Sequence, residues 1–177
     1  MLSTVPGTCS RTRARAVSLE MEPAALVADG LPPVPQALVD RTRPYMEFRT
    51  ASFQDWDPQT KSMLVSTRFG NVAQLHSVAG PLMARRQISF EAEPIGGTYL
   101  PGDGTLVVAK DKGGDEFYQL YTLKDGRLTL ITDGKSRNSL SAVSADGKLI
   151  GLSSTRRNGT DTDLYVMDPR DPASAKM

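Results

Sequence analysis

Residues 117–134 read FYQLYTLKDGRLTLITDG, and this stretch indicates how the chain folds. The run Phe117–Leu123 is rich in residues that favour β-strands, and its successive side chains would point to opposite faces. Asp125-Gly126 separates it from a second such run, Arg127–Thr132. Because an Asp-Gly pair suits the type I′ turn of a tight hairpin, the stretch predicts two antiparallel strands. Three further pairs predict turns of the same kind: Asp103-Gly104, Asp133-Gly134 and Asp146-Gly147.

The strand-like runs recur with a period near 44 residues. Gln74-Leu75-His76 matches Gln119-Leu120-Tyr121 after 45 positions, and Asp163-Leu164-Tyr165 follows after another 44. The first turn of each unit recurs at steps of 46 and 43, at Asp57-Pro58, Asp103-Gly104 and Asp146-Gly147. A period of this length, with hairpin turns inside it, is typical of one four-stranded blade of a β-propeller.

The sequence therefore predicts an all-β fold, an incomplete β-propeller with two full four-stranded blades and most of a third. The blades span about 49–92, 93–135 and 136–177. Eleven strands are predicted, at Thr50–Trp56, Met63–Arg68, Ala73–Val78, Arg85–Phe90, Gly97–Leu100, Leu106–Lys110, Phe117–Leu123, Arg127–Thr132, Ser139–Ser144, Leu149–Ser154 and Asp163–Met167. The second strand of each blade is a near-continuous apolar run, as expected for a strand covered on both faces.

The third blade is predicted to lack its fourth strand, because the chain continues after Asp163–Met167 as a short polar tail rich in Asp and Pro. That strand would then be an unpaired edge, which is a template for pairing with another chain. Three blades are too few to close a ring, which typically has 4–8. We therefore expect the isolated chain to self-associate. Gly151 is expected to let neighbouring blades approach closely.

Residues 1–44 are predicted to lie outside the partial propeller, which spans 45–177, as a flexible leader and a Pro-rich extended segment. The longest apolar run of the leader, Ala24–Ala28, is too short for a signal peptide, although a transit peptide is an alternative. Pro32, Pro33 and Pro35 favour an extended chain. A short helix is predicted over Gln36–Arg43, ending before Pro44.

Composition excludes several classes of function. The chain has 21 basic and 20 acidic residues, so it lacks the basic excess of a nucleic-acid-binding protein. No apolar run approaches the ~20 residues that span a bilayer, which argues against a membrane protein and leaves a cytoplasmic location as the default. One cysteine, Cys9, and one histidine, His76, exclude a cysteine-based zinc site and leave few general bases.

Three segments of the repeats carry a resemblance to a known family: Gly134–Asn138, Ser144–Lys148 and Ser153–Pro169. They resemble the N-terminal β-propeller of the prolyl oligopeptidase family, especially its bacterial dipeptidyl-aminopeptidase and acylaminoacyl-peptidase members. The same blades are similar to TolB-like propellers. The resemblance covers about residues 30–177. The stretch from Ser154-Thr155-Arg156 to DTDLYVMDP, which ends at Pro169, is more specific for this type of blade than for the peptidase.

The resemblance implies a longer parent protein, a serine peptidase, in which an α/β-hydrolase domain with a Ser-Asp-His triad follows the propeller. There the propeller would gate or position the peptide substrate. This chain has no G-x-S-x-G nucleophile elbow, since Gly134–Asn138 lacks the final glycine. We therefore expect an N-terminal fragment or truncated product without catalytic residues, cofactor or metal. The alternative is a non-enzymatic TolB-like propeller that serves as a scaffold for protein–protein binding.

Asp115 and Glu116 are the candidate substrate-binding residues. In dipeptidyl peptidases of the family, acidic propeller residues hold the free amine of the substrate, which is what the resemblance implies for this pair. Adjacent side chains on an extended chain point to opposite faces, which favours an ordinary surface pair instead.

The two longest polar loops, Asp111–Glu116 and Arg156–Thr162, are the candidate partner-facing surface. Both join the second and third strands of a blade, so they lie at the same end of the array, where loops commonly make contacts. The alternative is a solvated charged rim. The candidate residues are Lys110, Asp111, Lys112, Arg156, Arg157 and Asp161, with Asp115 beside them.

Two further groups receive a structural interpretation. His76 stands where the other units have Tyr121 and Tyr165, which favours packing over catalysis. Asn158, Asp161 and Asp163 lack the spacing of an EF-hand and are predicted to close a polar turn.

Overall fold

The computed structural model describes residues 29, 30 and 32–177, so the predictions for the leader before Asp29 lie outside the described residues. Contacts divide the chain into two compact units, one ending at Phe48 and the other spanning Arg49–Met177. Each unit is described by itself.

Among its described residues the first unit contains one helix, α1 (Gln36–Met46), which has no buried side chain. The prediction that this helix ends before Pro44 is wrong, because Pro44 lies inside its last turn. A proline removes one backbone hydrogen bond, and near the end of a helix little else depends on that bond. The last turn of the helix is still hydrogen-bonded, since the Glu47 N–H donates to the Arg43 carbonyl oxygen at 2.9 Å.

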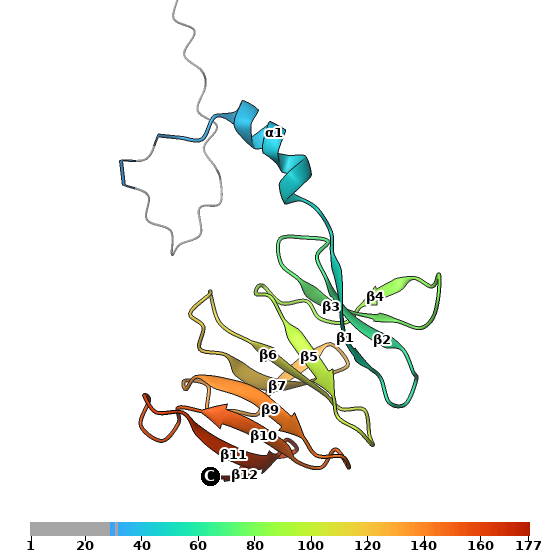
Figure 1. The fold of residues 1–177 in the computed structure, drawn as a ribbon, viewed down its shortest axis with the longest axis vertical. Helices are drawn as coiled ribbons and strands as arrows, with labels where there is room; N and C mark the ends of the chain where they lie inside the picture. Colours follow the sequence, from blue (N-terminus) through green and yellow to red (C-terminus); the bar gives the residue numbers. More distant parts are fainter. Residues whose placement is uncertain (1–28, 31) are drawn as a thin grey trace, which may run out of the picture. The chain divides into compact units, whose positions relative to one another are not determined.

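The second unit contains three four-stranded antiparallel sheets, each with its strands in chain order (Figure 1). The first sheet consists of β1 (Ala51–Trp56), β2 (Met63–Thr67), β3 (Gln74–Val78) and β4 (Arg85–Gln87). The second consists of β5 (Gly96–Tyr99), β6 (Leu106–Lys110), β7 (Gln119–Lys124) and β8 (Arg127–Leu130). The third consists of β9 (Asn138–Val143), β10 (Ile150–Ser154), β11 (Asp163–Asp168) and β12 (Asp171–Lys176).

The all-β class and a four-stranded antiparallel unit for each repeat are confirmed, and each of the eleven predicted strands is present. The prediction that the third unit lacks its fourth strand is wrong, because β12 pairs with β11. Asp168 stabilises the turn of this hairpin, because its carboxylate accepts a hydrogen bond from the Arg170 N–H at 2.9 Å. Pro172 fits β12 because an outermost strand does not need every N–H for pairing. Consequently β11 is not an unpaired edge.

Only one of the four Asp-Gly pairs forms the predicted type of turn. Both residues of Asp125-Gly126 have positive φ, 51° and 73°. In the other three pairs only the glycine has positive φ. There the aspartate accepts a hydrogen bond from the N–H two residues on, as Asp103 does from Thr105 at 3.0 Å. A side chain that stabilises the turn in this way removes the need for a second left-handed residue.

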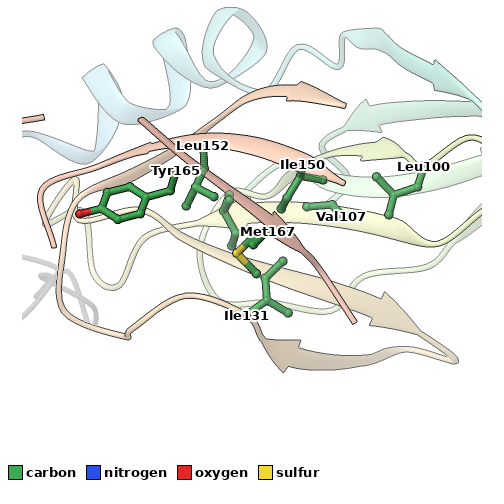
Figure 2. Close-up of a cluster of buried hydrophobic side chains, with 8 residues drawn as sticks. Leu100, Val107, Ile131, Ile150, Leu152, Tyr165 and Met167 are labelled. Carbon is green, nitrogen blue, oxygen red and sulfur yellow. The ribbon is translucent and has the colours of Figure 1, made fainter. Parts of the chain in front are cut away.

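The core lies between the sheets, with the second sheet packed against each of the other two. One buried cluster joins the first and second sheets and another joins the second and third. Strand β6 serves both, since Leu106 and Val108 belong to the former and Val107 to the latter. The cluster of the second and third sheets contains Leu100, Val107, Leu120, Ile131, Ile150, Leu152, Tyr165 and Met167 (Figure 2). Burying each large side chain contributes about 1.5–3 kcal/mol.

Glycines allow the sheets to approach at two places. A Cβ on Gly97 would lie 3.1 Å from a methyl carbon of Leu75 on the first sheet, and a Cβ on Gly147 would overlap the Pro101 carbonyl oxygen. Gly151, which was expected to serve this purpose, does not. A Cβ there would make only an ordinary 3.5 Å contact with Ala142 of its own sheet.

Candidate functional site

A cavity of about 680 Å³ is lined by strands of the second and third sheets, by loops at one of their ends and by Gln54 of the first sheet, and we call it the loop-end cavity. The pairing of Lys110 with Gln119 and of Ser154 with Asp163 places the β6–β7 and β10–β11 loops at this end. The lining comprises Gln54, Gly96, Gly97, Thr98, Val107, Val108, Ala109, Glu116, Tyr118, Leu120, Arg137, Asn138, Ser139, Leu140, Ser153 and Thr162. Of the described residues that line it, Glu116 and Arg137 are the charged ones.

Glu116 enters the lining because of an unusual backbone conformation. Its φ is 60°, in the left-handed region that residues other than glycine rarely adopt. The Asp111 carboxylate accepts a hydrogen bond from the Glu116 N–H at 3.2 Å, and Asp111 is itself buried. Strain of this kind costs about 1–3 kcal/mol and is concentrated at functional sites. The bond to Asp111 helps to hold Glu116 in this conformation.

Asp115 has a different role from its neighbour. Its carboxylate accepts hydrogen bonds from the Phe117 N–H at 2.9 Å and from the Lys112 N–H at 3.4 Å. These bonds close the loop on itself, and Asp115 is not part of the lining. The carboxylate of Glu116, by contrast, makes no hydrogen bond or ion pair with the described residues, so of the two candidates it is the one available to a ligand.

Arg137 lies in the link between the second and third sheets. Its guanidinium carbon lies 5.0 Å from the centroid of the Phe117 ring, and its backbone exchanges hydrogen bonds with Thr155 at 3.1 Å. Tyr118, which is about half exposed, adds an aromatic side chain to the same cavity. The cavity thus combines one anionic group, one cationic group and apolar surface from the sheets.

Two buried amides, Gln119 beside the cavity and Asn138 in its lining, bind the neighbouring backbone, and the sequence did not reveal this role. Gln119 donates to the Ser136 carbonyl oxygen at 2.6 Å and accepts from Thr132 at 2.7 Å and from the Gly134 N–H at 3.0 Å. Asn138 donates to the side-chain oxygen of Gln119 at 3.1 Å. Gln74 makes the equivalent bonds in the first sheet, to Ser89, Glu91 and Glu93. The recurrence of glutamine at this repeat position is the sequence feature that could have indicated this role.

Among the predicted partner-facing residues of the β6–β7 loop, Lys110 and Asp111 act within the protein. The Lys110 ammonium lies 2.7 Å from a carboxylate oxygen of Glu91 and 3.0 Å from one of Glu93. Burial acts to lower the pKa of Lys110, but these two carboxylates outweigh it and the pKa is raised. The hydrogen bond from Lys110 likewise lowers the pKa of Glu93. Lys112 is exposed.

The β10–β11 loop is also held by its own charges. Arg157 contacts carboxylate oxygens of Asp163 at 2.7 Å and of Asp161 at 3.1 Å, and the hydrogen bond to Asp163 raises the pKa of Arg157. The Arg156 guanidinium stacks over Tyr165, 4.7 Å from the ring centroid. One of its terminal nitrogens is buried without a hydrogen-bond partner among the described residues.

The residues that received a structural interpretation lie away from the cavity lining. His76 is buried, with Nδ1 3.0 Å from the Gln74 carbonyl oxygen and its ring 5.4 Å from that of Phe69. Asn158 closes its turn by accepting from the N–H groups of Thr160 and Asp161. In residues 29, 30 and 32–177, no three or more His, Cys, Asp or Glu side chains are grouped so as to hold a metal ion.

Within the same described part of the chain, no helix has the length and apolar character needed to cross a membrane. The chain matches no model of a known protein family, and no curated protein sequence matches it significantly.

Proposed function

We propose that this chain is the propeller part of a serine peptidase of the prolyl oligopeptidase family and that its loop-end cavity positions peptide substrate. The observation that carries the proposal is the placement of Glu116, the single carboxylate in a cavity with one guanidinium, Arg137. A short peptide has a cationic amine, an anionic carboxylate and apolar side chains. The cavity offers a complementary group for each.

The three stacked four-stranded sheets support the propeller part of the proposal, because radial repetition of such sheets is what a propeller consists of. The catalytic triad would belong to a hydrolase domain outside this chain. The chain itself has no nucleophile elbow, and its one histidine is buried beside a backbone carbonyl. Its contribution would be to binding and orientation rather than to bond cleavage.

Peptide binding tests the role of Glu116. We expect tripeptides with a free amine to bind the full chain more tightly than the same peptides with an acetylated amine, as measured by titration calorimetry. Glu116→Gln should remove the preference, since losing a charge-assisted hydrogen bond of about 1.4 kcal/mol weakens binding about tenfold.

Asp125→Asn is the matched control, because Asp125 is also an exposed acid with positive φ and lies outside the cavity lining. It should leave both affinities unchanged. Equal binding of the free and acetylated peptides would contradict the role of Glu116. It would favour the alternative, a TolB-like scaffold that recognises folded partners.

A second assay tests whether the chain alone is catalytic. We expect no turnover of aminoacyl or acylated-peptide chromogenic substrates by the purified chain. Turnover that disappears in a His76→Ala variant would show a catalytic site within this chain and would overturn the assignment.

A further inference from the structure

A second cavity, of about 550 Å³, is lined by residues of the first and second sheets, and we call it the hairpin-end cavity. The β1–β2, β5–β6 and β7–β8 turns contribute to its lining, so it lies at the end of the sheets opposite the β6–β7 loop. It shares no residue with the lining of the loop-end cavity. Its volume is in the range of small-molecule sites, about 300–1,000 Å³.

Three polar side chains face this cavity from opposite sheets. Leu75 of the first sheet faces the second sheet, and Ser77, two residues further along β3, shares that face. Arg86 pairs with Ser77 across the β3–β4 ladder and therefore lies on the same face. Tyr99 of β5 packs against the buried cluster that joins the two sheets. All three polar residues belong to the cavity lining.

The polar groups of these three side chains make no hydrogen bond or ion pair with the described residues. A guanidinium has five N–H donors and no acceptor, and each hydroxyl has one donor. Burial raises the pKa of Tyr99, and the charges of Asp57 and Asp55 add to this effect while Arg86 opposes it. The phenol therefore keeps its proton at neutral pH and can donate a hydrogen bond.

The acidic residues of the lining do not provide acceptors for these donors. The Asp57 carboxylate already accepts from the N–H groups of Gln59 at 2.8 Å and Thr60 at 3.1 Å, and from the Thr60 hydroxyl at 2.7 Å. Burial acts to raise the pKa of Asp57, but these hydrogen bonds outweigh it and the pKa is lowered. Asp125 directly follows Lys124, so this pair adds no net charge to the lining.

We propose that the hairpin-end cavity binds a small molecule that carries an oxyanion, a carboxylate or a phosphate, on an apolar group. The Arg86 guanidinium binds two oxygens of the anion, because its N–H groups match the geometry of carboxylates and phosphates. Tyr99 and Ser77 donate to the same anion. Ile88 and Leu106 offer apolar surface to the rest of the molecule. The inference does not depend on the proposed function.

Nuclear magnetic resonance titration of the full chain with benzoate, phenyl phosphate and benzamide tests this site. Benzamide has nearly the shape of benzoate but carries no charge. We expect each anion to bind at least about tenfold more tightly than benzamide, because charge-assisted hydrogen bonds are roughly twice as strong as neutral ones. The anion that binds more tightly identifies the ligand as a carboxylate or as a phosphate ester.

Two substitutions locate the binding. Arg86→Gln should remove the preference for anions, and Tyr99→Phe should weaken anion binding about fivefold because it removes one donor. Arg127→Gln is the matched control, since Arg127 is also an exposed arginine and lies outside the lining. It changes the net charge by the same amount as Arg86→Gln and should leave every affinity unchanged.

Several results would overturn the proposal. They are the absence of binding by all three compounds, benzamide binding as tightly as the anions, and anion binding that Arg86→Gln leaves unchanged. Inorganic phosphate that binds as tightly as phenyl phosphate would also do so, because the apolar lining would then contribute nothing. Glu116→Gln should not alter anion binding, so a failure of this site is distinguishable from a failure of the peptide cavity.

Discussion

Leu120 on β7 and Leu164 on β11 are 44 positions apart and occupy the same place in two successive repeats. Leu120 is 0% exposed and Leu164 is 70% exposed. The strand, the pairing and the residue type are the same, and only the presence of a following sheet differs. Burial at this repeat position therefore depends on whether a following sheet covers it.

The largest difference in stability is expected between the alanine variants of these two leucines. Leu120→Ala should lower the free energy of unfolding by about 2–5 kcal/mol, because it leaves a cavity between two sheets. Leu164→Ala should change it by less than about 0.5 kcal/mol, as for most exposed positions. Urea unfolding at low protein concentration, where association contributes least, measures both. Equal losses would show that Leu164 is covered even in a single copy.

Two glycines in turns provide the next comparison. Gly147 and Gly159 have positive φ, 68° and 79°, so alanine adds about 1–2 kcal/mol of backbone strain at either position. A Cβ on Gly147 would also overlap the Pro101 carbonyl oxygen, whereas one on Gly159 would meet no atom within 4 Å. Gly147→Ala should therefore cost about 1–3 kcal/mol more than Gly159→Ala. Thermal unfolding of the two variants measures the difference, and equal melting temperatures would contradict the close contact between the second and third sheets.

A smaller difference is expected between Gln119 and Asp163, which again share a repeat position. Gln119→Ala should cost about 1–3 kcal/mol, because it leaves buried partners such as the Ser136 carbonyl oxygen unsatisfied. Asp163→Ala removes a partly exposed ion pair with Arg157 and should cost about 1 kcal/mol or less. Denaturant unfolding distinguishes them. A larger loss for Asp163 would mean that the β10–β11 loop, rather than the cavity wall, holds this end together.

The sequence was sufficient for eleven of the twelve strands because most of them are β-favouring runs between turn residues and the 44-residue repeat places the others. It was insufficient for β12, whose residues Asp171–Lys176 have low strand propensity. That strand forms because β11 presents an edge and the Arg170 turn returns the chain to it. The sequence also does not show which residues of an apolar run are buried. Leu106–Val108 is buried throughout, whereas Leu149 at the start of the equivalent run is 44% exposed.

The candidate site was predictable only as a list of residues. Asp115 and Glu116 were identified as a pair, but their separation into a loop-closing residue and a cavity-lining residue follows from the positive φ of Glu116. Nothing in the order of the amino acids specifies that angle. Arg137 was not identified because its place in the cavity depends on how the link between two sheets packs, and that arrangement involves residues distant in sequence.

The smallest expected effect concerns the turn aspartates Asp103 and Asp146, which are equivalent in the second and third sheets. Arg170 contacts a carboxylate oxygen of Asp103 at 2.6 Å, and this hydrogen bond lowers the pKa of Asp103 from 3.8 to about 2. Asp146 also has a lowered pKa, but chiefly through a hydrogen bond from Ser144 of its own turn. Of these two aspartates, only Asp103 is bonded to another sheet, since it lies in the β5–β6 turn of the second sheet and Arg170 lies in the β11–β12 turn of the third.

A pKa that is lower in the folded state contributes stability above the unfolded value, and that contribution is lost as the pH falls through the folded value. We therefore expect the stability of the unsubstituted chain to fall as the pH is lowered from about 4 to about 2. Asp103→Asn should reduce this fall. Because both side chains are more than a third exposed, solvent screening limits the loss at pH 7 to at most about 1 kcal/mol. Urea unfolding at a series of pH values, with Asp146→Asn as the comparison, measures both slopes. If the two variants show the same pH dependence, the Arg170 pair does not stabilise the contact between the second and third sheets.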